Sequence, residues 1–193
     1  MNQDSKIGIF ICECSGEIGT RIRCADLVSF ATSLEGVKEV QTHQSYCMPL
    51  GLEEIKKAIA DRGIERVVVA GCSPRTHEAL FMKALSEANL NPYMLEVVNI
   101  RDHAATVMPS EEGATSKACA MLKISVARAG ELAPLENARV KPERRAIVIG
   151  TGLAGLSVAK ELVARGLNVL AVEKSEAAGG MLGRHYIMLP GPH

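Results

Sequence analysis

The feature that most constrains the fold is a regular alternation of short apolar segments with longer amphipathic ones. Apolar runs bounded by turn residues are typical of buried strands, and apolar residues at three- and four-residue steps are typical of helices. The predicted strands are Ile7–Cys12, Val37–Thr42, Arg66–Ala70, Tyr93–Val97 and Ala146–Gly150. The predicted helices are Ala25–Leu34, Leu52–Arg62, Arg75–Ala88 and Glu111–Gly130. This alternation predicts an α/β fold in which a doubly wound parallel sheet carries helices on both faces.

A proline-containing segment without clear periodicity, "PLENARVKPER", interrupts the alternation at residues 134–144. Such segments are typical of linkers between domains. We therefore predict an N-terminal α/β domain over residues 1–133, a linker over 134–144, and the incomplete start of a second domain over 145–193. The second domain opens with a strand–helix–strand pattern, the first βαβ unit of a Rossmann-like fold.

The composition argues against several classes of function. Lysine and arginine together number 22, as do aspartate and glutamate, so no charge excess indicates a nucleic-acid partner. Aromatic residues make up only 3% of the chain and tryptophan is absent, which also disfavours base stacking. The chain has no secretory signal pattern and no apolar stretch long enough to span a membrane. We therefore expect a cytoplasmic protein with no membrane span.

In that compartment, the six cysteines are better explained by metal binding or redox chemistry than by disulfides. Four of them lie where predicted strands end. Cys12 ends the first strand and Cys14 comes two residues later. Cys47 lies in the loop after the second strand, and Cys72 directly follows the third. Because ligand sites in doubly wound sheets form beyond the carboxyl ends of the strands, these loops are predicted to gather four thiols into one metal site.

The spacing of these cysteines helps to choose the metal. One Cys-x-Cys pair with two isolated cysteines matches neither the paired ligands of structural zinc sites nor the common ferredoxin run. We favour a [4Fe–4S] cluster; a zinc ion, unligated buried thiols and a thiol–disulfide enzyme are the alternatives. Cys24 and Cys119 fall in helical patterns among small and apolar residues, where free cysteine packs as a compact hydrophobe.

Four polar residues are expected near the same end of the sheet: Arg75, His77, Asn99 and Arg101. Hydrogen bonds from such residues to cluster sulfurs would tune the reduction potential. Helix capping and surface ion pairs explain them equally well from the sequence.

The segment "AIVIGTGLAGLSVAKELVARGLNVLAVE" carries a glycine pattern directly after a strand and at the start of a helix. Gly152 would let the backbone approach a pyrophosphate, and Gly155 would allow close contact between helix and strand. The helix N-terminus would face the phosphates, and Glu173, at the end of the next strand, would accept the ribose hydroxyls. The predicted cofactor-binding residues are Gly150, Gly152, Leu153, Ala154, Gly155, Glu173, Lys174 and Gly180.

Lys174 directly after the acid and the later pair Gly179–Gly180 are typical of the flavin version of this motif, so we favour FAD over NAD. The sequence runs only to His193, about 20 residues beyond Glu173. One βαβ unit cannot enclose a flavin, so we expect residues outside this sequence to hold the flavin ring.

Several segments together resemble one family: "FICECSGEIG", "YCMPLG", "VVVAGCSPRTHEALF", "NPYMLEVVNIRDH" and "VARAGELAPLE", followed by the flavin-type loop. They resemble the N-terminal portion of the A subunits of heterodisulfide reductases, a family of iron–sulfur flavoproteins. The resemblance implies that Cys12, Cys14, Cys47 and Cys72 hold a [4Fe–4S] cluster. It also implies contact with FAD by Gly150, Gly152, Gly155, Glu173 and Gly180.

The resemblance implies an oxidoreductase subunit that transfers electrons within a larger cytoplasmic complex, with flavin-based electron bifurcation in the assembled complex. The implied partners are other subunits of that complex, including a chain that completes the flavin domain, and ferredoxin or hydrogenase- or dehydrogenase-type electron donors. The alternative function is a non-catalytic assembly module of a flavoprotein complex, with zinc at the thiol site.

Overall fold

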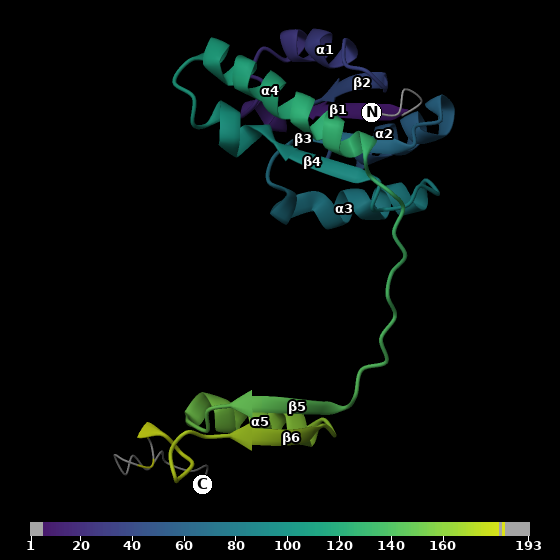
Figure 1. The fold of residues 1–193 in the computed structure, drawn as a ribbon. Helices are drawn as coiled ribbons and strands as arrows, with labels where there is room; N and C mark the ends of the chain where they lie inside the picture. Colours follow the sequence, from purple (N-terminus) through teal and green to yellow (C-terminus); the bar gives the residue numbers. More distant parts are fainter. Residues whose placement is uncertain (1–5, 182, 184–193) are drawn as a thin grey trace. The chain divides into compact units, whose positions relative to one another are not determined.

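The computed structural model describes residues 6–181 and 183, and it separates the chain into two compact units, Met1–Glu136 and Asn137–His193 (Figure 1). The first unit retains the start of the proline-containing segment, because the Asn91 side chain donates a 2.9 Å hydrogen bond to the Leu135 carbonyl. Residues 132–143 contain no helix or strand. The predicted second domain includes residues 182 and 184–193, which lie outside the described residues.

A four-stranded parallel sheet forms the centre of the first unit, with the order β2-β1-β3-β4. Its strands are β1 (Ile7–Cys12), β2 (Val37–His43), β3 (Arg66–Gly71) and β4 (Leu95–Asn99). The register sets Cys12 opposite His43 and Gly71 opposite Asn99, so the four strands end at the same level. The chain moves from β1 outward to β2 and then returns to β3 on the other side of β1. The crevice between β1 and β3 is therefore the switch point of the sheet, where ligands bind in such folds.

Two helices cover each face of this sheet (Figure 1). On one face, α1 and α4 pack against each other and over the strands; on the other, α2 and α3 do the same. The helices are α1 (Cys24–Thr32), α2 (Pro49–Arg62), α3 (Pro74–Glu87) and α4 (Glu111–Gly130). Each face of the sheet has its own apolar core. β1 contributes Ile9 and Ile11 to the core under α1 and α4, and Phe10 to the core under α2 and α3. The predicted α/β fold with a parallel sheet is confirmed.

The second unit contains one βαβ motif, made of β5 (Arg145–Ile149), α5 (Leu153–Ala164) and β6 (Asn168–Val172). β5 and β6 pair in parallel, as the sequence predicts. Its apolar side chains remain largely exposed: Ile149 is 86% accessible and Leu170 is 61% accessible. This motif alone does not build a closed core.

Two differences from the predicted bounds affect the site. β4 covers Leu95–Asn99 instead of Tyr93–Val97, because a turn at Asn91 accepts hydrogen bonds from the Tyr93 and Met94 N–H groups at 3.0 Å. α2 begins at Pro49 rather than Leu52, since proline suits the first turn of a helix. Two short elements were not predicted: a 3₁₀ turn at Cys14–Gly16 and a π-helix at Arg101–Ala105.

Candidate functional site

Four cysteines from three loops line one small cavity at the carboxyl-terminal end of the first sheet. The cavity has a volume of about 60 Å³. Its lining residues are Cys12, Cys14, Ser45, Cys47, Val69, Gly71, Cys72, Ser73, His77, Phe81, Val97 and Arg101. The structure thus brings together the four thiols that the sequence places at successive strand ends. Cys24 and Cys119 do not line this cavity.

Cys12 occupies the last position of β1 and is buried. Its Sγ lies 3.8 Å from the Gln44 carbonyl oxygen, in hydrogen-bonding contact with the loop after β2. Burial raises the pKa of the Cys12 thiol, while backbone hydrogen bonds at Tyr46 and Cys14 partly offset this rise. The neighbouring strand fits closely here, because a Cβ at Gly71 would lie 3.2 Å from the Cys12 Cβ. The end of β3 therefore leaves Cys12 little room to move.

Cys14 sits on a strained turn. Cys14 and Ser15 both have φ +51°, a left-handed conformation that residues other than glycine rarely adopt. The turn is held by backbone hydrogen bonds to the loop after β2: the Glu13 N–H donates to the His43 carbonyl at 3.0 Å, and the Ser15 N–H donates to the Gln44 carbonyl at 2.9 Å. Such strain persists where the surroundings impose it, commonly at functional sites.

The loop that carries Cys47 is anchored by its neighbour Tyr46, which is fully buried. The Tyr46 ring packs edge-on against Phe10, with centroids 5.4 Å apart, and lies 5.3 Å from the His43 ring. The first turn of α2 presses on this loop from the other side. A Cβ at Gly51 would lie only 2.5 Å from the Tyr46 Cα, so the "YCMPLG" segment requires glycine at its last position.

Cys72 lies between β3 and α3, and its thiol is half-buried. Burial raises the pKa of the Cys72 thiol; Cys14 raises it further, while the positive charge of Arg101 lowers it. His77, one turn into α3, lines the same cavity. Arg75 is exposed and is not among the lining residues.

Arg101 is the cation at this cavity. Its Nη1 lies 3.6 Å from the Cys14 Sγ, within hydrogen-bonding range of a sulfur acceptor, and 3.4 Å from a Glu17 carboxylate oxygen. Its Nε donates to Asp102 Oδ1 at 3.0 Å. Asp102, and then Cys14, raise the pKa of Arg101 above its ordinary value. Of the four polar residues expected here, Arg101 makes the contact with sulfur.

The cavity cysteines do not form a site for a single metal ion. Among residues 6–181 and 183, no group of three or more histidine, cysteine, aspartate or glutamate side chains is arranged to hold one metal ion. A tetrahedral zinc site needs four ligands around one centre. A cubic cluster instead binds each thiolate at its own iron corner, which suits thiols spread around a cavity wall.

The glycine loop of the second unit joins the end of β5 to the start of α5. Gly150 has φ +92°, and its N–H donates to the Val172 carbonyl at 2.7 Å, which joins the loop to the end of β6. Gly152 caps α5, whose first residues Leu153 and Ala154 are exposed. A Cβ at Gly155 would overlap the Gly150 carbonyl oxygen. Close backbone contact between loop and helix therefore demands glycine at position 155.

The second glycine pair lies against this loop. Gly180 has φ +55°, and a Cβ there would lie 3.0 Å from the Gly152 Cα. The Gly179 N–H donates to the Thr151 carbonyl at 2.8 Å. The exposed Lys174 follows β6. The motif residues of this unit thus gather around the start of α5.

Glu173 is bonded within the chain itself. Its Oε2 accepts hydrogen bonds from the Thr151 N–H (2.8 Å) and from the Thr151 hydroxyl (2.7 Å), and its Oε1 accepts one from the Ser175 N–H (3.0 Å). These bonds, led by that from the Thr151 N–H, lower the pKa of Glu173 to about 2. The sequence motif did not predict that Thr151 would hold the acid in place.

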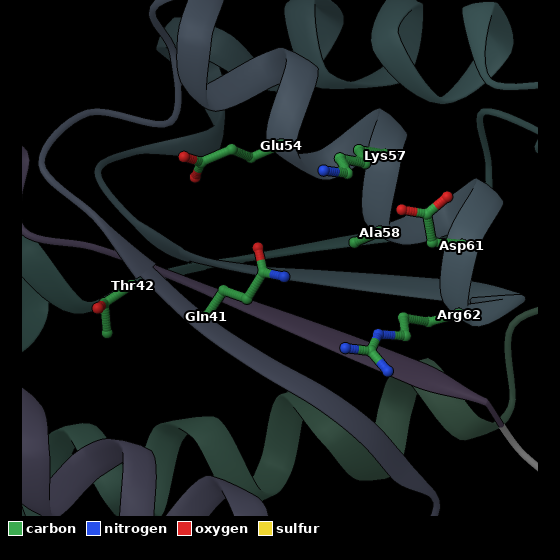
Figure 2. A pocket seen from close by; sticks show the side chains of 7 residues that line it. All are labelled: Gln41, Thr42, Glu54, Lys57, Ala58, Asp61 and Arg62. Carbon is green, nitrogen blue, oxygen red and sulfur yellow. The ribbon is translucent and has the colours of Figure 1, made fainter.

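A separate polar hollow of about 550 Å³ lies between β2 and α2 (Figure 2). It is lined by Gln41, Thr42, Glu54, Lys57, Ala58, Asp61 and Arg62. Its two acids and two bases balance, so it does not favour a ligand of one charge, and it contains none of the predicted site residues.

No helix of the described residues is long and apolar enough to cross a membrane.

Comparison with known proteins gives matches to both parts of the chain. A family described as an NAD(P)-binding Rossmann-like domain matches residues 148–186. The chain is 40% identical over 182 residues to the A subunit of the H(2)/formate:CoB-CoM heterodisulfide,ferredoxin reductase of Methanococcus maripaludis, covering 94% of this chain. The chain is similar to the N-terminal portion of the A subunits of heterodisulfide reductases. The predicted resemblance is confirmed.

Two further relatives of the same type match equally broadly. The chain is 39% identical over 183 residues to the A subunit of the H(2):CoB-CoM heterodisulfide,ferredoxin reductase of Methanothermobacter marburgensis. It is 37% identical over 182 residues to an iron-sulfur A subunit of the CoB--CoM heterodisulfide reductase of Methanopyrus kandleri. Each match covers 94% of this chain. The chain spans only 27–28% of the length of these three relatives.

Proposed function

We propose that this chain is an electron-transfer component of a heterodisulfide-reductase-like complex. It carries a [4Fe–4S] cluster on Cys12, Cys14, Cys47 and Cys72, together with the phosphate-binding part of an FAD site. The observation that carries this proposal is the meeting of four thiols, from three loops, at the switch point of a parallel sheet. One relative is named as an iron-sulfur subunit of a heterodisulfide reductase, which supports the same chemistry.

The four donors fit an iron–sulfur cluster in chemistry and in arrangement. Thiolates are the usual ligands of such clusters, and all four thiols line one cavity. A bound cluster would store one electron at a time. The chain's own residues bind it, cover it with the apolar side chains of Val69, Phe81 and Val97, and donate a hydrogen bond from Arg101 to the Cys14 sulfur. Such donors stabilise the more negative, reduced charge state.

The second unit supplies a dinucleotide site of the flavin type. The close contact at Gly155, the left-handed Gly150 and the helix N-terminus at Gly152 support pyrophosphate binding. A carboxylate oxygen can accept more than one hydrogen bond, so the Oε1 of Glu173, which accepts from the Ser175 N–H, can also receive a ribose hydroxyl. One βαβ motif does not enclose a flavin ring, so in this proposal residues beyond the motif hold the ring.

In this proposal the chain works in the cytoplasm as part of a larger assembly. The names of two relatives describe reductases that act on both a CoB-CoM heterodisulfide and ferredoxin. We propose that this chain belongs to such a complex. Ferredoxin, or a hydrogenase- or dehydrogenase-type protein, would exchange electrons with the complex. Bifurcation at the flavin is assigned to the assembled complex rather than to this chain alone.

Cysteine replacement tests the cluster. In protein purified without oxygen, serine at Cys12, Cys14, Cys47 or Cys72 should lower the iron content and the brown absorbance. Serine at Cys24 or Cys119 is the matched control and should leave both near the wild-type level, because neither residue lines the cavity. Stoichiometric zinc in a colourless wild-type protein would overturn the proposal in favour of a zinc-binding assembly module.

A further inference from the structure

A chain of side-chain hydrogen bonds leads from the end of β4 to the cluster cavity. Asn99, the last residue of β4, is buried. Its Nδ2 donates to Asp102 Oδ2 at 2.9 Å, and its Oδ1 accepts from the Asp102 N–H at 3.0 Å. Asp102 Oδ1 in turn accepts from the Arg101 Nε at 3.0 Å, and the Arg101 Nη1 contacts the Cys14 Sγ at 3.6 Å. Each group thus fixes the next one.

The two bonds at Asn99 hold both the backbone and the carboxylate of Asp102, at the start of the π-helix Arg101–Ala105. π-helices are rare and frequently mark functional sites. Without this support, the Arg101 side chain would have one carboxylate contact left, the 3.4 Å contact with Glu17. The Glu17 side chain is 67% accessible, and exposed ion pairs of this kind hold a side chain only weakly.

We propose that Asp102 and Asn99 are positioning residues that hold the Arg101 guanidinium against the Cys14 sulfur. This inference rests on the proposed function, because its purpose is to place a fixed cation and N–H donor at one ligand of the cluster. A donor in this place withdraws charge from the sulfur and makes the cluster easier to reduce. The carboxylate of Asp102 acts on the cluster through Arg101 rather than directly.

Asp102 could influence the cluster directly through its charge or indirectly by holding Arg101. The direction in which the reduction potential changes on removal of Asp102 distinguishes these two roles. If Asp102 acted directly, its removal would delete a negative charge near the cluster and make reduction easier. If Asp102 acts by holding Arg101, its removal releases the cation and the donor, and reduction becomes harder. Asn99 carries no charge, so its removal can change the potential only through the arrangement that it supports.

The test is a redox titration of the cluster in anaerobically purified protein, followed by electron paramagnetic resonance. Arg101→Ala, Asp102→Ala and Asn99→Ala should each shift the midpoint potential to more negative values. In an Arg101→Ala background, neither Asp102→Ala nor Asn99→Ala should lower it further. Glu17→Gln is the matched control, because it removes the other carboxylate at Arg101 and should cause no negative shift. A positive shift in Asp102→Ala, or an equal negative shift with Arg101 absent, would refute the proposal.

A second measurement keeps this test separate from the test of the cluster itself. In metal-free ¹⁵N-labelled chain, the Arg101 Nε–H signal should exchange with solvent several-fold faster in Asp102→Ala and in Asn99→Ala than in wild type. Unchanged exchange in both variants would refute the positioning role. If the wild-type protein carries no cluster, the proposed function fails, whereas the exchange rates still decide whether Asp102 and Asn99 hold Arg101.

Discussion

At the scale of single residues, several glycines have separate physical reasons to be glycine. Gly51 and Gly155 are required by the protein itself, because a Cβ at either position would strike backbone atoms. Gly152 is different: a Cβ there would meet nothing within 4 Å, and its φ of −70° suits any residue. The open space beside Gly152 is where a pyrophosphate would lie. One motif therefore contains one glycine that the structure requires and one that the proposed function assigns to pyrophosphate binding.

The pair Gly155→Ala and Gly152→Ala should separate stability from binding. Gly155→Ala should lower the stability of the second unit by roughly 1–3 kcal/mol, the usual cost of overpacking. Gly152→Ala should leave stability near the wild-type value but reduce dinucleotide binding by the intact protein. Denaturant unfolding and flavin content of the assembled protein measure the two effects. Equal destabilisation by both substitutions would show that Gly152 is also structural.

At the scale of secondary-structure elements, Glu173 connects the end of β6 to the loop between β5 and α5 through Thr151. This connection depends on the charge of the carboxylate. Its pKa lies at about 2 in the folded chain, below its ordinary value of 4.5. A carboxyl group with a lowered folded pKa contributes stability above the unfolded pKa and loses it as the pH falls toward the folded pKa. The link is therefore complete above about pH 4.5 and weakens as the pH falls toward 2.

Titration of the Glu173 side chain checks this link directly. By ¹³C NMR of the carboxyl group, the wild-type residue should stay ionised well below pH 4. In Thr151→Val, which loses the hydroxyl but keeps the N–H, the pKa of Glu173 should rise part of the way toward 4.5. A wild-type pKa near 4.5 would show that the Thr151 contacts do not form in solution.

The element order was predictable from the sequence, and so were the ends of the first three strands to within one residue, because apolar periodicity marks these strands. The gathering of Cys12, Cys14, Cys47 and Cys72 followed from those strand ends. The contact between Arg101 and Cys14 did not, because it joins residues 87 positions apart through a π-helix that no periodicity marks. The two-residue shift of β4 depended on a local turn at Asn91, a side-chain contact that competes with strand formation.

At the scale of the whole molecule, the two units differ in how well each buries its apolar residues. The first unit encloses two apolar cores, one on each face of its sheet. In the second unit, Ile147 on β5 is 67% accessible, and Val163 on α5 is 59% accessible. Soluble monomers rarely leave apolar side chains of neighbouring elements open together. We therefore expect further protein to cover the second unit.

The 193-residue chain should for this reason associate or bind a hydrophobic dye when produced alone. Light scattering after size exclusion and dye fluorescence measure these properties. The double substitution of Ile147→Lys and Ile149→Lys should reduce both, because these side chains are 67% and 86% accessible on β5. The cavity in the first unit should be unaffected. A monodisperse wild-type monomer of 20.6 kDa that binds no dye would contradict the expectation.

The hydrogen bonds that join the turn at Cys14 to the loop after β2 bear on how the holoprotein matures. Those bonds run between backbone groups and between the Ser15 and Ser45 hydroxyls, 2.9 Å apart, and none of them involves a metal. The left-handed turn is therefore set by the polypeptide, and under the proposed function the four thiols should already line their cavity before iron binds. In zinc fingers, by contrast, metal binding and folding are one event. Here the first unit should fold first and accept its cofactor afterwards, so iron-starved cells should accumulate a folded precursor that is ready for loading.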